Sequence, residues 1–316
     1  MKAIEWYIAG VGAVGSSLAG RFCQGGLNVT LLLKNKAQLT LYQQSALTLI
    51  DGHNTSTHNP KAISIDEFKD EPIQHLICCV KAYDVMELLL QLKPHLSEKS
   101  LVILIHNGLG LLEDIKQQLP QLRIVSGVCT IGAYCEAPFK AHAFFGGKIH
   151  IGSALGHITH HERNTLCKAF NEAQLPVQWE DNIHTITWEK FAQNCCINLL
   201  TAVLNCKNGE LLKHIEFLKT LSMEVSQVLN AHGQSISADG LLQSVCQLLN
   251  ITADNYSSMY TDVHHGKPTE LHYLNEHLVS LAKEKNVKTH LNSRLLDQFY
   301  NEDPCCAKKT ANASKK

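Results

Sequence analysis

The chain has 316 residues, of which 45% are hydrophobic and 18% charged, so it is long enough for two domains with sizeable apolar cores. Its formal net charge of −1 offers no electrostatic footprint for nucleic acid or an anionic membrane. No apolar run reaches the roughly 18 residues that span a bilayer, and no secretory signal is apparent, so we expect a cytoplasmic protein.

The first predicted strand covers residues 3–9 and ends in a glycine turn. A helical pattern over residues 16–23 and a second strand over 28–33 follow. This order opens a dinucleotide-binding fold, in which the glycines permit a tight turn, close approach of the pyrophosphate and helix–strand packing. The helix N-terminus adds free N–H groups for phosphates. The alternative is a glycine-rich turn without a ligand. The candidate cofactor-binding residues of the turn are Gly10, Val11, Gly12, Ala13, Val14 and Gly15.

The end of the second strand bears on cofactor choice. NAD-selective folds place an acidic residue here, where it binds the ribose 2′-hydroxyl. This sequence instead carries Lys34 and Lys36, and no carboxylate. Two cations favour a 2′-phosphate and hence NADP, although they would also suit an ordinary solvated loop.

Strands and helices continue to alternate through the first half of the chain. The expected strands cover residues 75–80, 101–106 and 175–179, with further, partly antiparallel, strands within 123–152, and the expected helices cover 82–93, 109–119 and 159–173. Lys81 and Asn107 directly follow two of these strands. Because the carboxyl ends of parallel strands line one crevice, we expect Gly10, Lys81 and Asn107 to meet there as ligand-binding residues. Read singly, Lys81 would be a helix-start cation and Asn107 part of a turn.

Helical periods dominate from about residue 182. The expected helices cover residues 184–205, 209–232, 238–250, 268–286 and 290–301. We therefore predict an α/β chain with an N-terminal Rossmann-type doubly wound sheet and a C-terminal all-helical domain. The predicted domains are residues 1–181, which bind the cofactor, and residues 182–302, which bind the substrate, followed by a disordered polar tail at 303–316.

The helix predicted over residues 184–205 carries a narrow polar strip. At about 100° per residue, five polar side chains fall within about 80° of an otherwise apolar circumference. Asparagine is a poor helix former, and a buried ammonium or amide is costly without a partner. A strip of this composition favours a ligand-facing surface over a narrow solvated face. The residues of the polar strip are Lys190, Asn194, Asn198, Thr201 and Asn205.

Two further sites in the helical half carry polar residues of interest. Glu270 lies in the predicted opening turn of a helix, where the dipole favours a carboxylate in any case. Ser257-Ser258 taken alone is a capping or loop pair. No GxSxG motif argues for a hydrolase.

The cysteines and histidines do not indicate a metal site. The twelve cysteines include three adjacent pairs, Cys78-Cys79, Cys195-Cys196 and Cys305-Cys306, and no CxxC pair. The 18 histidines are scattered and lack an HExxH setting. We expect no metal, and mostly reduced core thiols.

Taken together, the motifs resemble the ketopantoate reductase family, NADPH-dependent enzymes of pantothenate and coenzyme A synthesis. The resemblance covers about residues 1–300. The blocks that carry it are the glycine turn, Val80-Lys81-Ala82, His106-Asn107-Gly108, residues 188–194, 198–211 and 255–259, and Thr269-Glu270.

The resemblance implies roles for residues of the helical half. It implies that Lys190 is the general acid that protonates the keto oxygen of the substrate, and that Glu270 helps to place it. It also implies that Asn194, Asn198 and Ser258 bind substrate.

Further roles implied by the resemblance concern the cofactor. Lys81 and Asn107 would face the cofactor and the active site, with Asn107 also near the substrate and Glu270 near the cofactor. Asn208 matches a family position near the site. Lys34 stands where the family usually has arginine, which keeps the charge but loses the planar fork.

The implied function is the NADPH-dependent reduction of 2-dehydropantoate (ketopantoate) to (R)-pantoate. The expected partner is this small molecule, with no nucleic acid or membrane, and the expected assembly is a monomer or homodimer. Hydride reduction leaves charge on the keto oxygen, which needs a proton donor and fixed dipoles; a lysine beside amides suits that need. The alternatives are a related NAD(P)-dependent 2-keto acid or hydroxyacid dehydrogenase and a non-catalytic NADPH-binding regulator.

Overall fold

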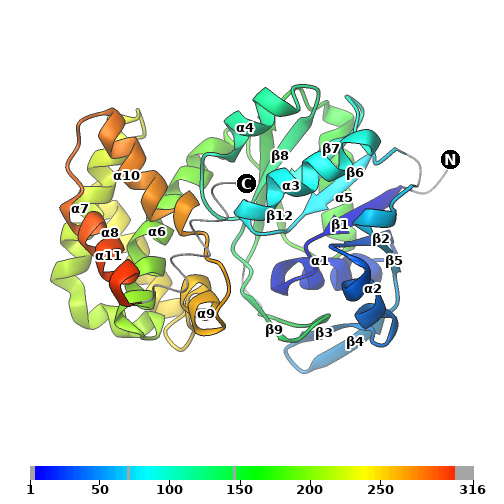
Figure 1. The fold of residues 1–316 in the computed structure, drawn as a ribbon, viewed down its shortest axis with the longest axis horizontal. Coiled ribbons are helices and arrows are strands. Elements are labelled where there is room, and N and C mark those ends of the chain that lie inside the picture. The colour runs from blue at the N-terminus through cyan, green and yellow to red at the C-terminus, as the bar shows by residue number, and fades with distance from the viewer. Residues whose placement is uncertain (1–3, 70–71, 145–146, 303–316) are drawn as a thin grey trace. The chain divides into compact units, whose positions relative to one another are not determined.

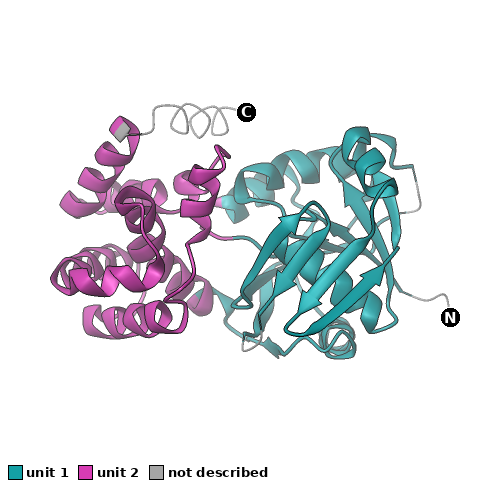
Figure 2. Ribbon diagram, turned by 90° about the horizontal axis from the view of Figure 1, so that it is seen from below, with its two compact units in different colours: residues 1–106, 111–184 teal, residues 107–110, 185–316 magenta. Residues whose placement is uncertain are grey.

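The computed structural model describes residues 4–69, 72–144 and 147–302. The predicted tail at 303–316 lies outside the described residues. The chain divides into two compact units (Figure 2), which are residues 1–106 with 111–184 (unit 1) and residues 107–110 with 185–316 (unit 2). Each unit has its own apolar core.

Unit 1 is built on an eight-stranded sheet (Figure 1). Its six strands from β8 to β5 pair in parallel, and β11 runs antiparallel to β8. This confirms the predicted parallel sheet with partly antiparallel additions. In spatial order the strands are β12 (Val177–Trp179), β11 (Ile149–Leu155), β8 (Arg123–Cys129), β7 (Leu101–Leu104), β6 (His75–Cys78), β1 (Glu5–Ala9), β2 (Asn28–Leu33) and β5 (Lys61–Ser64).

The central strands of this sheet are apolar on both faces. All four residues of β7 are buried, as are Trp6 to Ala9 of β1 and Val29 to Leu33 of β2. Continuous burial is expected where helices cover both faces of a parallel sheet. The helices of unit 1 are α1 (Ala13–Gln24), α2 (Lys36–Gln43), α3 (Ala82–Leu92), α4 (Leu111–Gln118) and α5 (His160–Glu172), with short 3₁₀ turns η1 (Ile65–Glu67) and η2 (Lys93–His95).

A second sheet of four strands was not predicted from the sequence. Its order is β4 (Asn54–His58), β3 (Leu47–Asp51), β10 (Lys140–Ala143) and β9 (Ala133–Ala137). Helix α1 contacts β1 and β2 of the first sheet as well as β3 and β10 of the second. Gly20 permits this approach, because a Cβ there would lie 3.0 Å from the Cβ of Leu49.

Unit 2 is helical, as predicted. Its core consists largely of leucine and valine side chains, and burying each contributes about 1.5–3 kcal/mol. No helix in the described part of the chain combines the length and the apolar character needed to cross a membrane. The helices that pack around this core are α6 (Ile183–Leu204), α7 (Ile215–Ala231), α8 (Ala238–Ile251), α9 (Ser258–His264), α10 (Asn275–Glu284) and α11 (His290–Glu302), with the 3₁₀ turns η3 (Asn208–His214) and η4 (Leu271–Tyr273).

Two of the predicted helices are each divided in the structure. The helix expected at 209–232 is the turn η3 followed by α7. The helix expected at 268–286 is the turn η4 followed by α10, so Glu270 does not lie in the opening turn of an α-helix, contrary to the prediction. Long-range contacts explain both breaks. The N–H of Gly209 donates to the carbonyl of Ala253, and the N–H of Leu109 donates to the carbonyl of Tyr273.

The polar strip is one residue shorter than predicted, because α6 ends at Leu204. Asn205 has a φ of +50° and follows the helix in the left-handed region, which asparagine tolerates better than most residues. The N–H of Cys206 donates to the carbonyl of Thr201, and that of Asn205 to the carbonyl of Ala202. Asn205 therefore ends the helix and does not extend the polar strip.

Candidate active site

The glycine turn joins β1 to α1 in unit 1. Gly10 has a φ of +85°, and its carbonyl accepts a hydrogen bond of 2.8 Å from the N–H of Gly12. Gly12 is the residue that caps the N-terminus of α1, and it has no side chain to bond the free N–H groups of the first turn. These N–H groups and the dipole of a 12-residue helix are suited to bind a phosphate.

The space around the three glycines differs. A Cβ on Gly10 would lie 2.4 Å from the backbone nitrogen of Val80, and one on Gly15 would lie 2.1 Å from the carbonyl oxygen of Gly10. A Cβ on Gly12 would meet no atom within 4 Å. Gly10 and Gly15 are thus required by the fold, whereas Gly12 borders open space that a pyrophosphate would fit. Along the same turn Val11 is buried, and Ala13 and Val14 are half-buried.

The cations after β2 are exposed and paired. Lys34 Nζ lies 3.2 Å from Asp84 Oδ1, and Lys36 Nζ lies 2.6 Å from Glu67 Oε1. The hydrogen bond and charge of Glu67 raise the pKa of Lys36. Both ammonium groups are exposed, so an anion could reach them and would compete with the carboxylates for them.

Lys81 lies at the same edge of the sheet as the glycine turn. It precedes α3 as its N-terminal cap residue, three residues after β6. Strand β6 pairs in parallel with β1, and the N–H of Cys79 donates to the carbonyl of Ala9. The chain thus brings Gly10 and Lys81 to adjacent strand ends, whereas Asn107 is grouped with unit 2.

The helical residues of the polar strip are more buried than a solvated face would be. Lys190 is half-buried, and the side chains of Asn194 and Asn198 are 8% and 6% exposed. The buried Nδ2 of Asn194 has no hydrogen-bond partner among the described residues. An unpaired buried amide costs about 1–3 kcal/mol, so a polar ligand or water is the expected partner.

Asn107 and Glu270 form a contact within unit 2. Asn107 Nδ2 donates to Glu270 Oε2 at 3.1 Å, and the carboxylate is 4% exposed. Two neighbours hold this contact in place. Gly108 packs closely against Tyr273, because a Cβ on Gly108 would lie 2.5 Å from it. The N–H of Leu109 donates a hydrogen bond of 3.0 Å to the carbonyl of Tyr273. The sequence prediction did not pair Asn107 with Glu270, which lies 163 residues further along the chain.

The serine pair and Asn208 have distinct surroundings. Ser257 is buried, caps α9 by accepting from the N–H of Tyr260, and places its Oγ 2.7 Å from Thr201 Oγ1 of the polar strip. Ser258, the predicted substrate ligand, is exposed. Asn208 Nδ2 donates to Thr252, whereas its buried Oδ1 has no partner among the described residues. Asn194 and Asn208 therefore each have one buried amide atom without a hydrogen-bond partner among the described residues.

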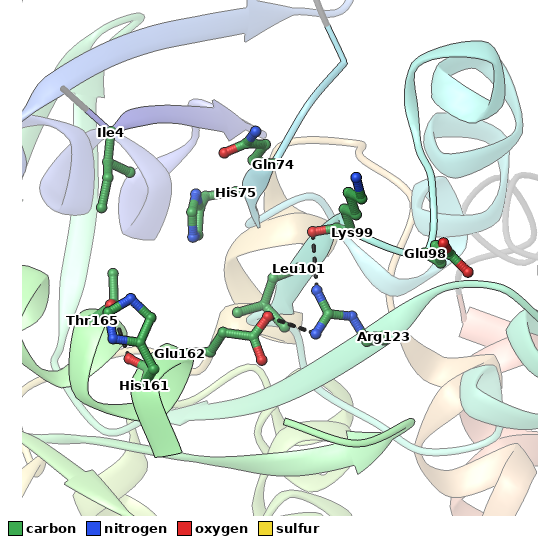
Figure 3. A pocket seen from close by; sticks show the side chains of 10 residues that line it. All are labelled: Ile4, Gln74, His75, Glu98, Lys99, Leu101, Arg123, His161, Glu162 and Thr165. Carbon is green, nitrogen blue, oxygen red and sulfur yellow. Dashed lines mark hydrogen bonds and ion pairs between the residues drawn. The ribbon is translucent and has the colours of Figure 1, made fainter. Parts of the chain in front are cut away.

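Unit 1 has a pocket of about 710 Å³, whose lining residues are drawn in Figure 3. The pocket lies at the N-terminal ends of the parallel strands, whereas the glycine turn lies at the C-terminal end of β1. His75, Leu101 and Arg123, which line the pocket, are the first residues of β6, β7 and β8. Arg123 Nη1 donates to Glu162 Oε1 at 2.6 Å, and its Nη2 donates to the carbonyl of Lys99. The predicted site residues do not line this pocket, and its main cation is already paired.

One buried amide pair of unit 2 was not predicted from the sequence. Asn275 and Asn292 are fully buried and hydrogen-bonded to each other. Asparagines at apolar positions of the helical periods were the signal that could have identified them.

Two family models match the chain. The model described as ketopantoate reductase PanE/ApbA matches residues 6–156, and the model of its C-terminal part matches residues 182–300. The 2-dehydropantoate 2-reductase of Vibrio cholerae serotype O1 is 33% identical over 229 residues, which cover 71% of this chain and 76% of that protein. The enzyme of the same name from Salmonella typhi is 30% identical over 290 residues, or 92% of each chain.

Among solved structures, the chain is similar to D-mandelate dehydrogenase in a ternary complex with NADH and anilino(oxo)acetate. The TM-score is 0.88 at 21% sequence identity, and the match covers 96% of this chain and 100% of that chain. At this level of identity the similarity shows a common fold.

Proposed function

Because the chain belongs to the ketopantoate reductase family, we propose that it reduces 2-dehydropantoate to (R)-pantoate with NADPH, a step of pantothenate and coenzyme A synthesis. It is an oxidoreductase that uses a nicotinamide cofactor. One observation of the structure carries the proposal furthest, namely a lysine and two asparagines along one side of α6, with an unused amide atom on Asn194. A small polar substrate fits this set of donors.

The residues of unit 2 supply the proton and the substrate contacts. The bound nicotinamide supplies the hydride. Lys190 Nζ gives a proton to the keto oxygen as negative charge develops there, which a general acid typically accelerates by about 10²–10⁴. The amides of Asn194 and Asn198 bind the hydroxyl and carboxylate groups of the substrate, and Ser258 adds a further contact. Asn208 lies near the site.

Glu270 has a positioning role in this mechanism. Its carboxylate accepts from Asn107 Nδ2, so it orients that amide, and it helps to place the Lys190 ammonium. We propose that Lys81 binds the cofactor and that Asn107 binds the cofactor and the substrate. A buried carboxylate held by fixed donors needs little reorganisation as charge moves during the reaction.

The preference for NADPH rests on unit 1. The glycine turn of residues 10–15 binds the pyrophosphate, and Lys34 binds the 2′-phosphate. Lys34 is a point charge that is shared with Asp84, so its selectivity is weaker than that of a bidentate arginine. We propose that residues 1–181 form the cofactor domain and 182–302 the substrate domain, in a monomer or homodimer.

The direct test follows the ultraviolet absorbance of NADPH after addition of ketopantoate to the purified protein. We expect rapid oxidation of NADPH and formation of (R)-pantoate. A related 2-keto acid dehydrogenase is the second candidate, because the fold matches that of D-mandelate dehydrogenase. Faster turnover of the 2-keto acid that corresponds to D-mandelate would favour this second function. No turnover of either would favour an NADPH-binding regulator.

A further inference from the structure

A chain of buried hydrogen bonds in unit 2 connects α6 to the start of α10. Asn275 Nδ2 donates to the carbonyl oxygen of Cys195 at 2.9 Å and to Asn292 Oδ1 at 2.8 Å. Asn275 and Asn292 are both 0% exposed, so water does not reach these groups. Each bond in such a place is costly to break, because the remaining partner stays buried and unpaired.

Glu224 lies at the other end of this hydrogen-bond network and sets the direction of its hydrogen bonds. One carboxylate oxygen of Glu224 accepts from the backbone N–H and the Nδ2 of Asn292, and the other accepts from the N–H of Leu291. Because Asn292 Nδ2 donates to Glu224, the Oδ1 of Asn292 faces Asn275 and accepts from it. Asn275 then has to donate in both bonds, and its own Oδ1 has no partner among the described residues.

One end of this network, at Cys195, and its central residue, Asn275, adjoin proposed site residues. Cys195 follows Asn194 on α6, and its carbonyl lies between the positions of Lys190 and Asn198 along the helix. Asn275 begins α10, two residues after the end of the 3₁₀ turn η4, which Glu270 caps. The N–H of Tyr273 donates to the carbonyl of Glu270, and that of Leu274 to the carbonyl of Leu271.

We propose that Asn275 is a positioning residue for the reaction, which sets the polar strip of α6 in place relative to Glu270. This inference rests on the proposed function, because it assigns Asn275 an effect through Lys190. Asn275 itself contacts a backbone carbonyl and an amide, and it does not contact the reacting groups. A general acid displaced by about 1 Å can lose roughly 10²-fold in rate, so a small shift of α6 is sufficient.

The test compares Asn275→Leu, which keeps the size but removes both donors, with Asn275→Ser, which keeps one donor. We expect kcat to fall by roughly 10–100-fold in Asn275→Leu and by less in Asn275→Ser. The KM for NADPH should not change, since the glycine turn lies in unit 1. If Asn275→Leu does not fold, Asn275→Ser alone still tests the proposal.

Val245→Ala is the matched control for lost stability. Val245 is fully buried in the same core, on α8, and it takes no part in the hydrogen-bond network. All assays are made well below the melting temperature of each variant. We expect Val245→Ala to lower the melting temperature and to keep kcat. An Asn275→Leu variant that melts early but turns over at the normal rate would show that Asn275 only stabilises the fold.

A second variant separates this inference from the proposed function. If Asn275 acts through Lys190, then Asn275→Leu should cause little further loss in a Lys190→Ala background. An equal loss in both backgrounds would overturn the positioning role and leave the proposed function intact. Normal turnover by Lys190→Ala alone would instead overturn the proposed mechanism.

Discussion

Two adjacent charged residues of α6 lie in different surroundings. Glu189 is exposed, whereas Lys190 is half-buried and lies one turn before the buried Asn194. A half-buried lysine is less hydrated than a surface lysine but still has polar neighbours. Such a position suits a proton donor better than a fully exposed position does. Its neighbour Glu189 is therefore a natural control for it.

We expect Lys190→Ala to lower kcat by roughly 10²–10⁴, because the keto oxygen loses its proton donor. The KM for NADPH and the melting temperature should change little. Steady-state kinetics and thermal unfolding measure these quantities. Glu189→Ala should keep the normal kcat, and Asn198→Ala should raise the KM for ketopantoate. A folded Lys190→Ala enzyme with near-normal kcat would contradict the assignment.

We propose that single residues at the end of β2 also decide the choice between NADPH and NADH. We expect Lys34→Asp to raise the KM for NADPH far more than that for NADH, because a second carboxylate beside Asp84 repels the 2′-phosphate. Lys168→Asp, the same change at an exposed position of α5, should affect neither KM. Equal use of both cofactors by the unaltered enzyme would argue against the role of Lys34.

The candidate site residues could be identified from the sequence where they share a short-range pattern. Lys190, Asn194 and Asn198 are grouped by the helical period, and the three glycines by their spacing. The pairing of Asn107 with Glu270 could not be predicted, because 163 residues separate them and each suits an ordinary turn. The same is true of Asn275 and Asn292, whose contact depends on how α10 and α11 pack.

At the level of elements, the predicted ends of helices and strands agree well with the structure where the apolar residues recur regularly. Strand β2 covers the predicted residues, and α6 is shifted by one residue. The missed elements lie between residues 36 and 64, where strands are short, one side is polar and the apolar alternation spans few residues. The division of the helix at 268–286 was missed because the bond from Leu109 to Tyr273 comes from a distant segment.

Helix α5 offers a test of how an element is fixed to the sheet. Although burial opposes it, hydrogen bonds from Thr159 and Arg123 hold the pKa of Glu162 at about 2. A folded-state pKa below the unfolded value stabilises the protein above that unfolded value, near 4.5, and the stabilisation is lost as the pH falls toward 2. The capping box of α5 and its bond to β8 both depend on this carboxylate.

We therefore expect Glu162→Gln to lower the free energy of unfolding at neutral pH. The difference from the unaltered protein should shrink between pH 4.5 and pH 2. Urea unfolding at a series of pH values measures it. Glu172→Gln, at the other end of α5, should show a smaller difference at neutral pH. A constant deficit for Glu162→Gln across the acid range would contradict the assigned pKa.

At the scale of the whole molecule, the class of fold was predictable because each half repeats one type of pattern. Alternating strands and helices predict the parallel sheet, and continuous helical periods predict the helical unit. The four-stranded second sheet was not predictable, since β3 and β10 pair across about 90 residues of chain.

The two separate cores predict distinguishable unfolding transitions. A ligand that binds only the folded state raises the free energy of unfolding by about 2.7 kcal/mol at 100 times its Kd. Because we propose that unit 1 binds the cofactor, NADP⁺ should stabilise unit 1 more than unit 2. Trp6 and Trp179 report on unit 1 and Trp188 on unit 2. In Trp188→Phe, the remaining fluorescence transition should shift upward with NADP⁺ by more than the helical circular dichroism signal. Equal shifts would show that the units unfold together.

The grouping of residues 107–110 with unit 2 has a consequence for dissecting the protein. The backbone passes from one unit to the other at residues 106–107, 110–111 and 184–185, so no single cut yields both units intact. A gene fragment for residues 185–302 would encode Glu270 without the amide of Asn107, and Tyr273 without the N–H of Leu109. Such a fragment would need the tetrapeptide grafted back, for example by a circularly permuted gene in which this loop is joined to the helical unit.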